Sequence, residues 1–168
     1  MNQIYRELSE RIRGDLKELN YIAQRATQSW TRGKAKPEEQ DVYLESVALN
    51  LHGFYSGIER LFEMIARHVD QDVPIGDTWH RDLLLQMTTD IENIRPAIIS
   101  QESATSLDEF RRFRHLVRNI YTFNLVPEKM ASLLTSLSSL WEQLQAELLA
   151  FADFVEEMAK ADTNQRNK

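Results

Sequence analysis

Residues 44–69 read LESVALNLHGFYSGIERLFEMIARHV, and their apolar residues recur with the spacing of a helix. The steps between them alternate between three and four residues, which is typical of one buried helix face. The first row comprises Leu44, Val47, Leu51, Phe54, Ile58, Leu61 and Ile65, and a second row comprises Ala48, Tyr55, Phe62, Ala66 and Val69. This broad face predicts a helix over about residues 38–69 that buries against two neighbours. They are either two helices of one bundle, or one helix and a second subunit.

Helical spacing continues through the rest of the chain, and strand signals are almost absent, so we expect an all-α antiparallel bundle of about five helices. The first predicted helix spans residues 4–30 and ends in TRGKAKP. The third starts at an N-cap formed by Asp77 or Thr78 and continues to about residue 94, before Pro96. The apolar steps of residues 4–30 indicate that the first helix has one buried face.

Two further helices are predicted after residue 100. A capping box of Ser106 and Glu109 is expected to begin the fourth helix, which ends near Asn124. Pro127, at the first helical position, begins the fifth, whose apolar residues keep heptad steps as far as Met158. We expect the second and fifth helices to be the longest and to pack together. Residues 1–160 are predicted to form a single domain, followed by a polar tail at 161–168.

Composition limits the classes of function. The chain has 168 residues, 42% of them hydrophobic, and a net charge of -6, so any affinity for nucleic acid must come from a local patch. The absence of cysteine excludes disulfides, thiolate nucleophiles and thiolate metal sites. We find no signal peptide and no apolar run near the roughly 20 residues of a membrane span. We therefore expect a cytoplasmic protein with no membrane association.

The stretch FRHLVRNIYTF, residues 113–123, carries such a patch. Its apolar residues fall on one arc of a helix, and its polar residues fall on the other. With the preceding Arg111 and Arg112, the polar arc holds Arg114, Arg118, His115, Asn119 and Tyr121. The nearest acids, Asp108 and Glu109, are expected in the first turn of this helix, where its dipole favours them. The cationic face predicts an anionic partner, although a solvated helix surface is the alternative.

Common enzyme signatures are missing. The sequence has no glycine-rich phosphate loop, no HExxH and no GxSxG, and its four histidines lack metal-ligand spacing. If the chain is an enzyme, we therefore expect it to work without a metal or other cofactor.

Three features outside the cationic patch have both a structural and a functional interpretation. Gly53 and Gly57 permit either a close helix neighbour or a dimer contact. Glu59 lies in a row that is either solvated or able to orient an arginine of the cationic helix. Trp79 and His80 open the third helix, where they either pack locally or stack on a base.

The same cationic residues also carry a family resemblance. Arg114, followed by His115, a short spacer, Asn119, one residue and Tyr121, resembles the motif of HEPN-fold proteins of the HepT-like type. In that motif a histidine stands at the position of Asn119. The segments YSGIERLFE (55–63) and TWHRDLLLQM (78–87) resemble the same family, and the likeness covers most of residues 1–160. These proteins are the toxin half of bacterial HEPN and minimal nucleotidyltransferase toxin-antitoxin pairs.

The resemblance implies a metal-independent RNA endonuclease that acts as a homodimer, with the motif helices of both subunits lining one cleft. Arg114 would hold the scissile phosphate, and Arg111 and Arg118 would bind further phosphates. The family histidine would move the proton of the ribose 2'-OH. Asn119 cannot accept this proton, so we predict that His115 takes the role, one turn back and roughly 6 Å along the axis.

The resemblance also implies a partner. The cognate nucleotidyltransferase antitoxin would neutralise the chain, either through nucleotidylation of Tyr121 or, where Tyr121 merely borders the core, by direct binding. The alternative is a catalytically inactive HEPN-like regulatory protein that binds RNA, a nucleotide or the partner. Both functions require the arginines, so the sequence leaves the choice open.

Overall fold

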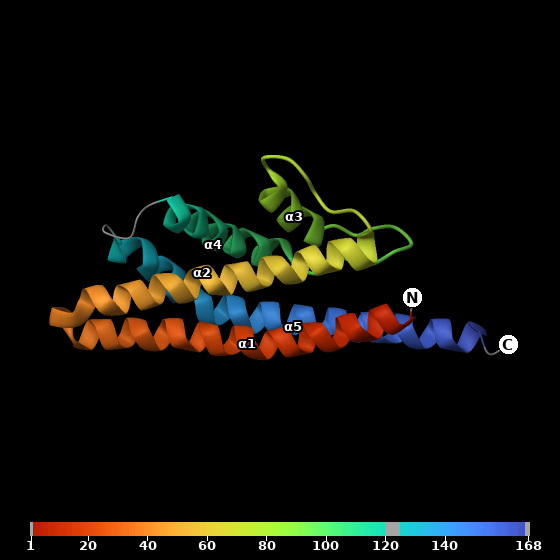
Figure 1. Cartoon of the computed structure of the whole chain (residues 1–168), viewed down its shortest axis with the longest axis horizontal. Helices are drawn as coiled ribbons and strands as arrows, with labels where there is room; N and C mark the ends of the chain where they lie inside the picture. Colours follow the sequence, from red (N-terminus) through yellow and green to blue (C-terminus); the bar gives the residue numbers. More distant parts are fainter. Residues whose placement is uncertain (1, 120–124, 167–168) are drawn as a thin grey trace.

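The structure is a computed structural model that describes residues 2–119 and 125–166, with side chains for residues 3–117 and 125–161. Its helices are α1 (Asn2–Ala35), α2 (Gln40–Ile65), α3 (Trp79–Met87), α4 (Gln101–Asn119) and α5 (Pro127–Arg166) (Figure 1). A 3₁₀ turn precedes α2, and a π-helical turn, Ala66–Asp70, continues it. The described residues contain no strand, only an isolated β-bridge between Ile91 and Arg95. The all-α prediction is therefore confirmed.

The long helices α1, α2 and α5 form the body of the molecule, and α3 and α4 lie on the side of α2 that faces away from α1 (Figure 1). The apolar rows predicted for α2 are buried along their whole length. They bury against α1 and α4 of the same chain. Of the two arrangements open for this broad face, the chain therefore shows two helices of one bundle.

The partner of α5 differs from the prediction. The fifth helix packs mainly along α1, which runs antiparallel to it, and has little contact with α2. Ser9 donates a hydrogen bond to the carbonyl of Ala152, and Trp141 Nε1 donates one to Asn20 Oδ1. The longest helices are α5, with 40 residues, and α1, with 34, whereas α2 has 26. The expected pairing was wrong because α1 and α4 already cover the apolar face of α2.

Two helix boundaries also differ from the prediction. The third helix stops at Met87 rather than near residue 94, and the hydroxyls of Thr88 and Thr89 both donate to the carbonyl of Leu85. Such side-chain bonds compete with the continuing helix. The fourth helix begins at Gln101, before the predicted capping box, because the Ser100 hydroxyl caps the N–H of Ser103.

Other boundaries agree with the sequence. Thr78 stands at the N-cap of α3, and Pro127 is the first residue of α5. The predicted end of the fourth helix near Asn124 lies outside the described residues. Among the described helices, none combines the length and the apolar character needed to cross a membrane.

A buried ion pair holds the segment between α3 and α4 to the π-helical turn that follows α2. The carboxylate of Asp70 accepts hydrogen bonds from Arg95 Nε at 2.5 Å and Nη2 at 2.6 Å, and both side chains are fully buried. Gln86 of α3 donates to the same carboxylate. Arg95 also donates to the carbonyls of Thr89, Pro96 and Gln86. This network fixes the segment between α3 and α4 against α2.

The two glycines of α2 have different surroundings. A β-carbon at Gly57 would lie 2.6 Å from Leu19 Cδ2, whereas one at Gly53 would meet nothing within 4 Å. Gly57 therefore permits the close approach of α1, and Gly53 has no such role within the described chain.

We expect Gly53→Ala and Gly57→Ala to change stability differently. Alanine at position 53 should raise the free energy of unfolding by about 0.5–1 kcal/mol through helix propensity. The free energy of unfolding of Gly57→Ala should be about 1–3 kcal/mol lower than that of Gly53→Ala, because buried Leu19 must move. Urea unfolding followed by circular dichroism measures both. Equal values for the two variants would contradict the assigned role of Gly57.

Candidate active site

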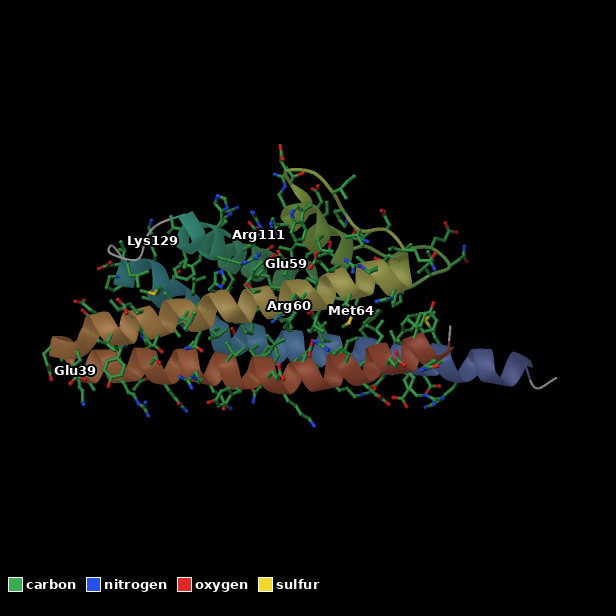
Figure 2. All side chains as sticks on the ribbon, viewed as in Figure 1. Glu39, Glu59, Arg60, Met64, Arg111 and Lys129 are labelled. Carbon is green, nitrogen blue, oxygen red and sulfur yellow. The ribbon has the colours of Figure 1, made fainter. Side chains whose placement is uncertain are left out.

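Helices α2, α3 and α4 meet at a buried carboxylate. Glu59 on α2 is 4% exposed, and it accepts hydrogen bonds from Arg114 Nη1 of α4 at 2.6 Å and from His80 Nδ1 of α3 at 2.7 Å. Figure 2 shows Glu59 and, on α4, Arg111 in this region. Glu59 thus links two helices to α2 through their polar side chains. The interpretation that Glu59 orients an arginine is confirmed.

Arg114 contacts both Glu59 and the ring of Tyr55. Its side chain is 15% exposed, and its Cζ lies 5.9 Å from the ring centroid of Tyr55. Its buried Nε has no acceptor among the described residues. Burial, followed by the negative charge of Glu59, raises the pKa of Tyr55 above its ordinary value, so this phenol stays neutral beside the guanidinium. The guanidinium therefore has a fixed position and retains unused hydrogen-bonding capacity.

The same arginine borders a small pocket. Its lining residues are His80, Arg111, Arg114 and His115. A larger depression shares three of these residues and extends over residues 76–81 at the start of α3. Two guanidinium groups and two imidazoles therefore surround one accessible space. This set can bind an anion through the arginines and transfer protons through the histidines.

One acidic residue balances part of the cationic face. Asp108 accepts from Arg111 Nε at 2.7 Å and pairs with Arg112 Nη2 at 2.9 Å. The expectation that Asp108 lies in the first turn was wrong, because α4 begins at Gln101. Arg112, whose side chain is 68% exposed, lines no part of the small pocket. The candidate anion-binding pocket therefore includes only part of the cationic face.

The structure unites only some of the predicted site residues. Arg111, Arg114 and exposed His115 border the same pocket. The side chains of Arg118 and Asn119, and the whole of Tyr121, lie outside the described residues. Their predicted roles therefore stay predictions.

His80 has a partner in the structure that the sequence did not predict. The sequence suggested base stacking or local packing for it, and its ring does stack on Trp79, with centroids 3.6 Å apart and planes inclined by 29°. Its contact with Glu59, 21 positions earlier in the chain, was not expected. No local pattern connects two residues at that separation.

Among the described side chains, no group of three or more potential metal ligands is clustered.

Comparison with known proteins identifies the family. Residues 46–155, more than half of the chain, match the family model described as HepT-like protein. The chain belongs to the HepT-like family. The match confirms the resemblance and the HEPN-type domain, and it contains Glu59, His80 and Arg114. No curated protein and no solved structure matched this HepT-like chain.

Proposed function

We propose that this HepT-like chain is a metal-independent RNA endonuclease, the toxin of a HEPN and nucleotidyltransferase toxin-antitoxin pair. The observation that supports it is the pocket in which Arg111, Arg114 and His115 converge. Arg114, oriented by Glu59, binds the scissile phosphate and stabilises the charge that develops on it. His115 takes part in proton transfer, which Asn119 cannot perform. No metal or other cofactor enters this mechanism.

The homodimer is part of this proposal. The cationic helices of two subunits would lie near the two-fold axis and form one RNA cleft. Arginines of the two copies would repel each other unless an anion lies between them, and an RNA phosphate supplies that anion. Arg118 is proposed to add a further phosphate contact.

The proposed regulation acts through Tyr121 and a cognate nucleotidyltransferase antitoxin. A nucleotidyl group added to this phenol would bring negative charge and bulk to the arginines that bind RNA. RNA would then be excluded from the cleft. The support for this step is the position of Tyr121 two residues after Asn119, as in the family motif.

A second candidate function is a catalytically inactive regulatory protein that binds RNA, a nucleotide or the partner. The observation that favours it is the asparagine at position 119, where the family motif has histidine. This protein would use the same arginines without proton transfer. Binding and cleavage of RNA must therefore be measured separately.

We expect the purified protein to cleave RNA without added metal, and His115→Ala to reduce the rate by at least ~10²-fold, the usual scale for a lost proton-transfer group. Gel analysis of single-turnover cleavage measures this. His68→Ala, which replaces an exposed histidine outside the pocket, is the matched control and should keep the wild-type rate. Full activity in His115→Ala would refute the role of His115. RNA binding without cleavage by the wild-type chain would favour the second candidate.

A further inference from the structure

The Glu59–His80 contact lies beside the proposed phosphate site. The side chain of Glu59 is 5% exposed and that of His80 is 30% exposed. Because His80 and Arg114 bind different oxygens of one carboxylate, the position of the imidazole is tied to that of the guanidinium. Trp79 stacks on the imidazole and restrains its plane. His80 is therefore a fixed side chain at the edge of the pocket.

The hydrogen bond to Glu59 determines which ring nitrogen carries the proton. An ionised carboxylate accepts hydrogen bonds and cannot donate them, so Nδ1 of His80 must be the donor. In the neutral imidazole the lone pair is then on Nε2, which Glu59 does not engage. A carboxylate that orients a histidine in this way is a recurrent arrangement for a general base.

RNA cleavage through the 2'-OH needs two proton transfers. A base removes the proton of the 2'-OH, and an acid protonates the departing 5'-oxygen. Position 119 offers no titratable group, but the pocket holds two imidazoles, from α3 and α4. We propose that His80 is the general base of this reaction, that His115 is the general acid, and that Glu59 is the positioning residue of His80. This inference rests on the proposed RNA endonuclease function.

The proposed reaction balances without another reactant. Nε2 of His80 takes the 2'-OH proton while the 2'-oxygen forms a bond to phosphorus. The bond between phosphorus and the 5'-oxygen breaks, and protonated His115 gives its proton to that oxygen. The products are a 2',3'-cyclic phosphate and a 5'-OH. Arg114 stays paired with Glu59 and neutralises the charge on the phosphoryl oxygens.

A substrate with sulfur in place of the 5'-bridging oxygen separates the two histidines, because a thiolate leaves without protonation. We expect His80→Gln to lose at least ~10²-fold in rate on the ordinary RNA, the scale of a lost proton-transfer group. The same variant should stay impaired on the 5'-thio RNA. His115→Ala should recover most of its loss on that substrate. Glutamine at position 80 retains a donor for Glu59, and circular dichroism verifies the fold.

The role of Glu59 is tested by a spectroscopic signature. The ¹⁵N shifts of His80 should show a proton on Nδ1 in the wild-type protein, and Glu59→Leu should remove this preference and slow cleavage. Glu59→Gln retains an acceptor oxygen and should preserve more of both. An unchanged tautomer in Glu59→Leu would overturn the positioning role.

The results distinguish this inference from the proposed function. A wild-type chain that binds RNA without cutting it would overturn both. A wild-type chain that cleaves RNA, with His80→Gln equally active, would overturn only the role of His80. Recovery of His80→Gln on the 5'-thio RNA would overturn its assignment as the base.

Discussion

Arg114→Ala is expected to reduce RNA cleavage by about 10²–10³-fold, the effect of removing one preorganised donor to transition-state charge. Arg114 combines a hydrogen bond to buried Glu59 with a position on the pocket wall. The loss should appear mainly in kcat, because the positive charge acts most strongly on the charge that develops during the reaction. Arg114→Lys should lose less, since it retains the charge but not the planar guanidinium. Single-turnover rates and RNA affinity, measured separately, test this.

Arg112→Ala is the matched control for that experiment. Arg112 lies on the same helix, carries the same charge and pairs with Asp108, but it is exposed and does not line the small pocket. Its replacement should change the cleavage rate only slightly. Equal effects at positions 112 and 114 would indicate general charge attraction and contradict a specific role for Arg114. Thermal unfolding of both variants verifies that the chain stays folded. This matters most for Arg114→Ala, in which buried Glu59 loses its arginine partner.

The largest expected effect on stability concerns the buried pair of Asp70 and Arg95. Arg95→Ala should lower the free energy of unfolding by about 3–5 kcal/mol, because it leaves the Asp70 carboxylate buried without its cation. The variant also loses the hydrogen bonds that Arg95 donates to backbone carbonyls. For a chain of this size, the Tm should fall on the order of 10 °C. Urea and thermal unfolding followed by circular dichroism measure the change.

Two further variants make this test specific. Arg13→Ala removes an arginine that pairs with Asp153 and Glu156 at the surface between α1 and α5, and it should cost about 0–1 kcal/mol. The double variant Asp70→Leu, Arg95→Met removes both buried charges and should be less damaging than Arg95→Ala alone. A cost for Arg95→Ala no greater than that for Arg13→Ala would show that the buried pair contributes little.

Local spacing of residues made much of the architecture predictable. Apolar steps of three and four residues define a helix face without any knowledge of its partner, so the buried rows of α2 and α5 followed from the sequence. The start of α5 at Pro127 was equally local. Arg111, Arg114 and His115 lie within five positions on one helix, so their shared face was also predictable.

Which helices pair, and where some of them begin, depends on how the helices pack in three dimensions. Ser100 and Ser106 both suit an N-cap, but Ile98 and Ile99 donate backbone hydrogen bonds to the carbonyl of Met87, and their burial places Ser100 at the cap. The choice of α1 as the main partner of α5 depended on α4 covering part of α2. These outcomes depend on which apolar faces compete for one core, and such competition leaves no local sequence pattern.

The candidate site likewise combines a feature local to one helix with contacts that depend on helix packing. The cationic face of α4 can be predicted from the sequence, because residues on one helix are related by a fixed rotation. Only the packing of three helices brought His80 and Arg114 to the two oxygens of Glu59, since these residues come from separate parts of the chain. Their contact depends on how α3 and α4 pack on α2, which helical periodicity does not specify.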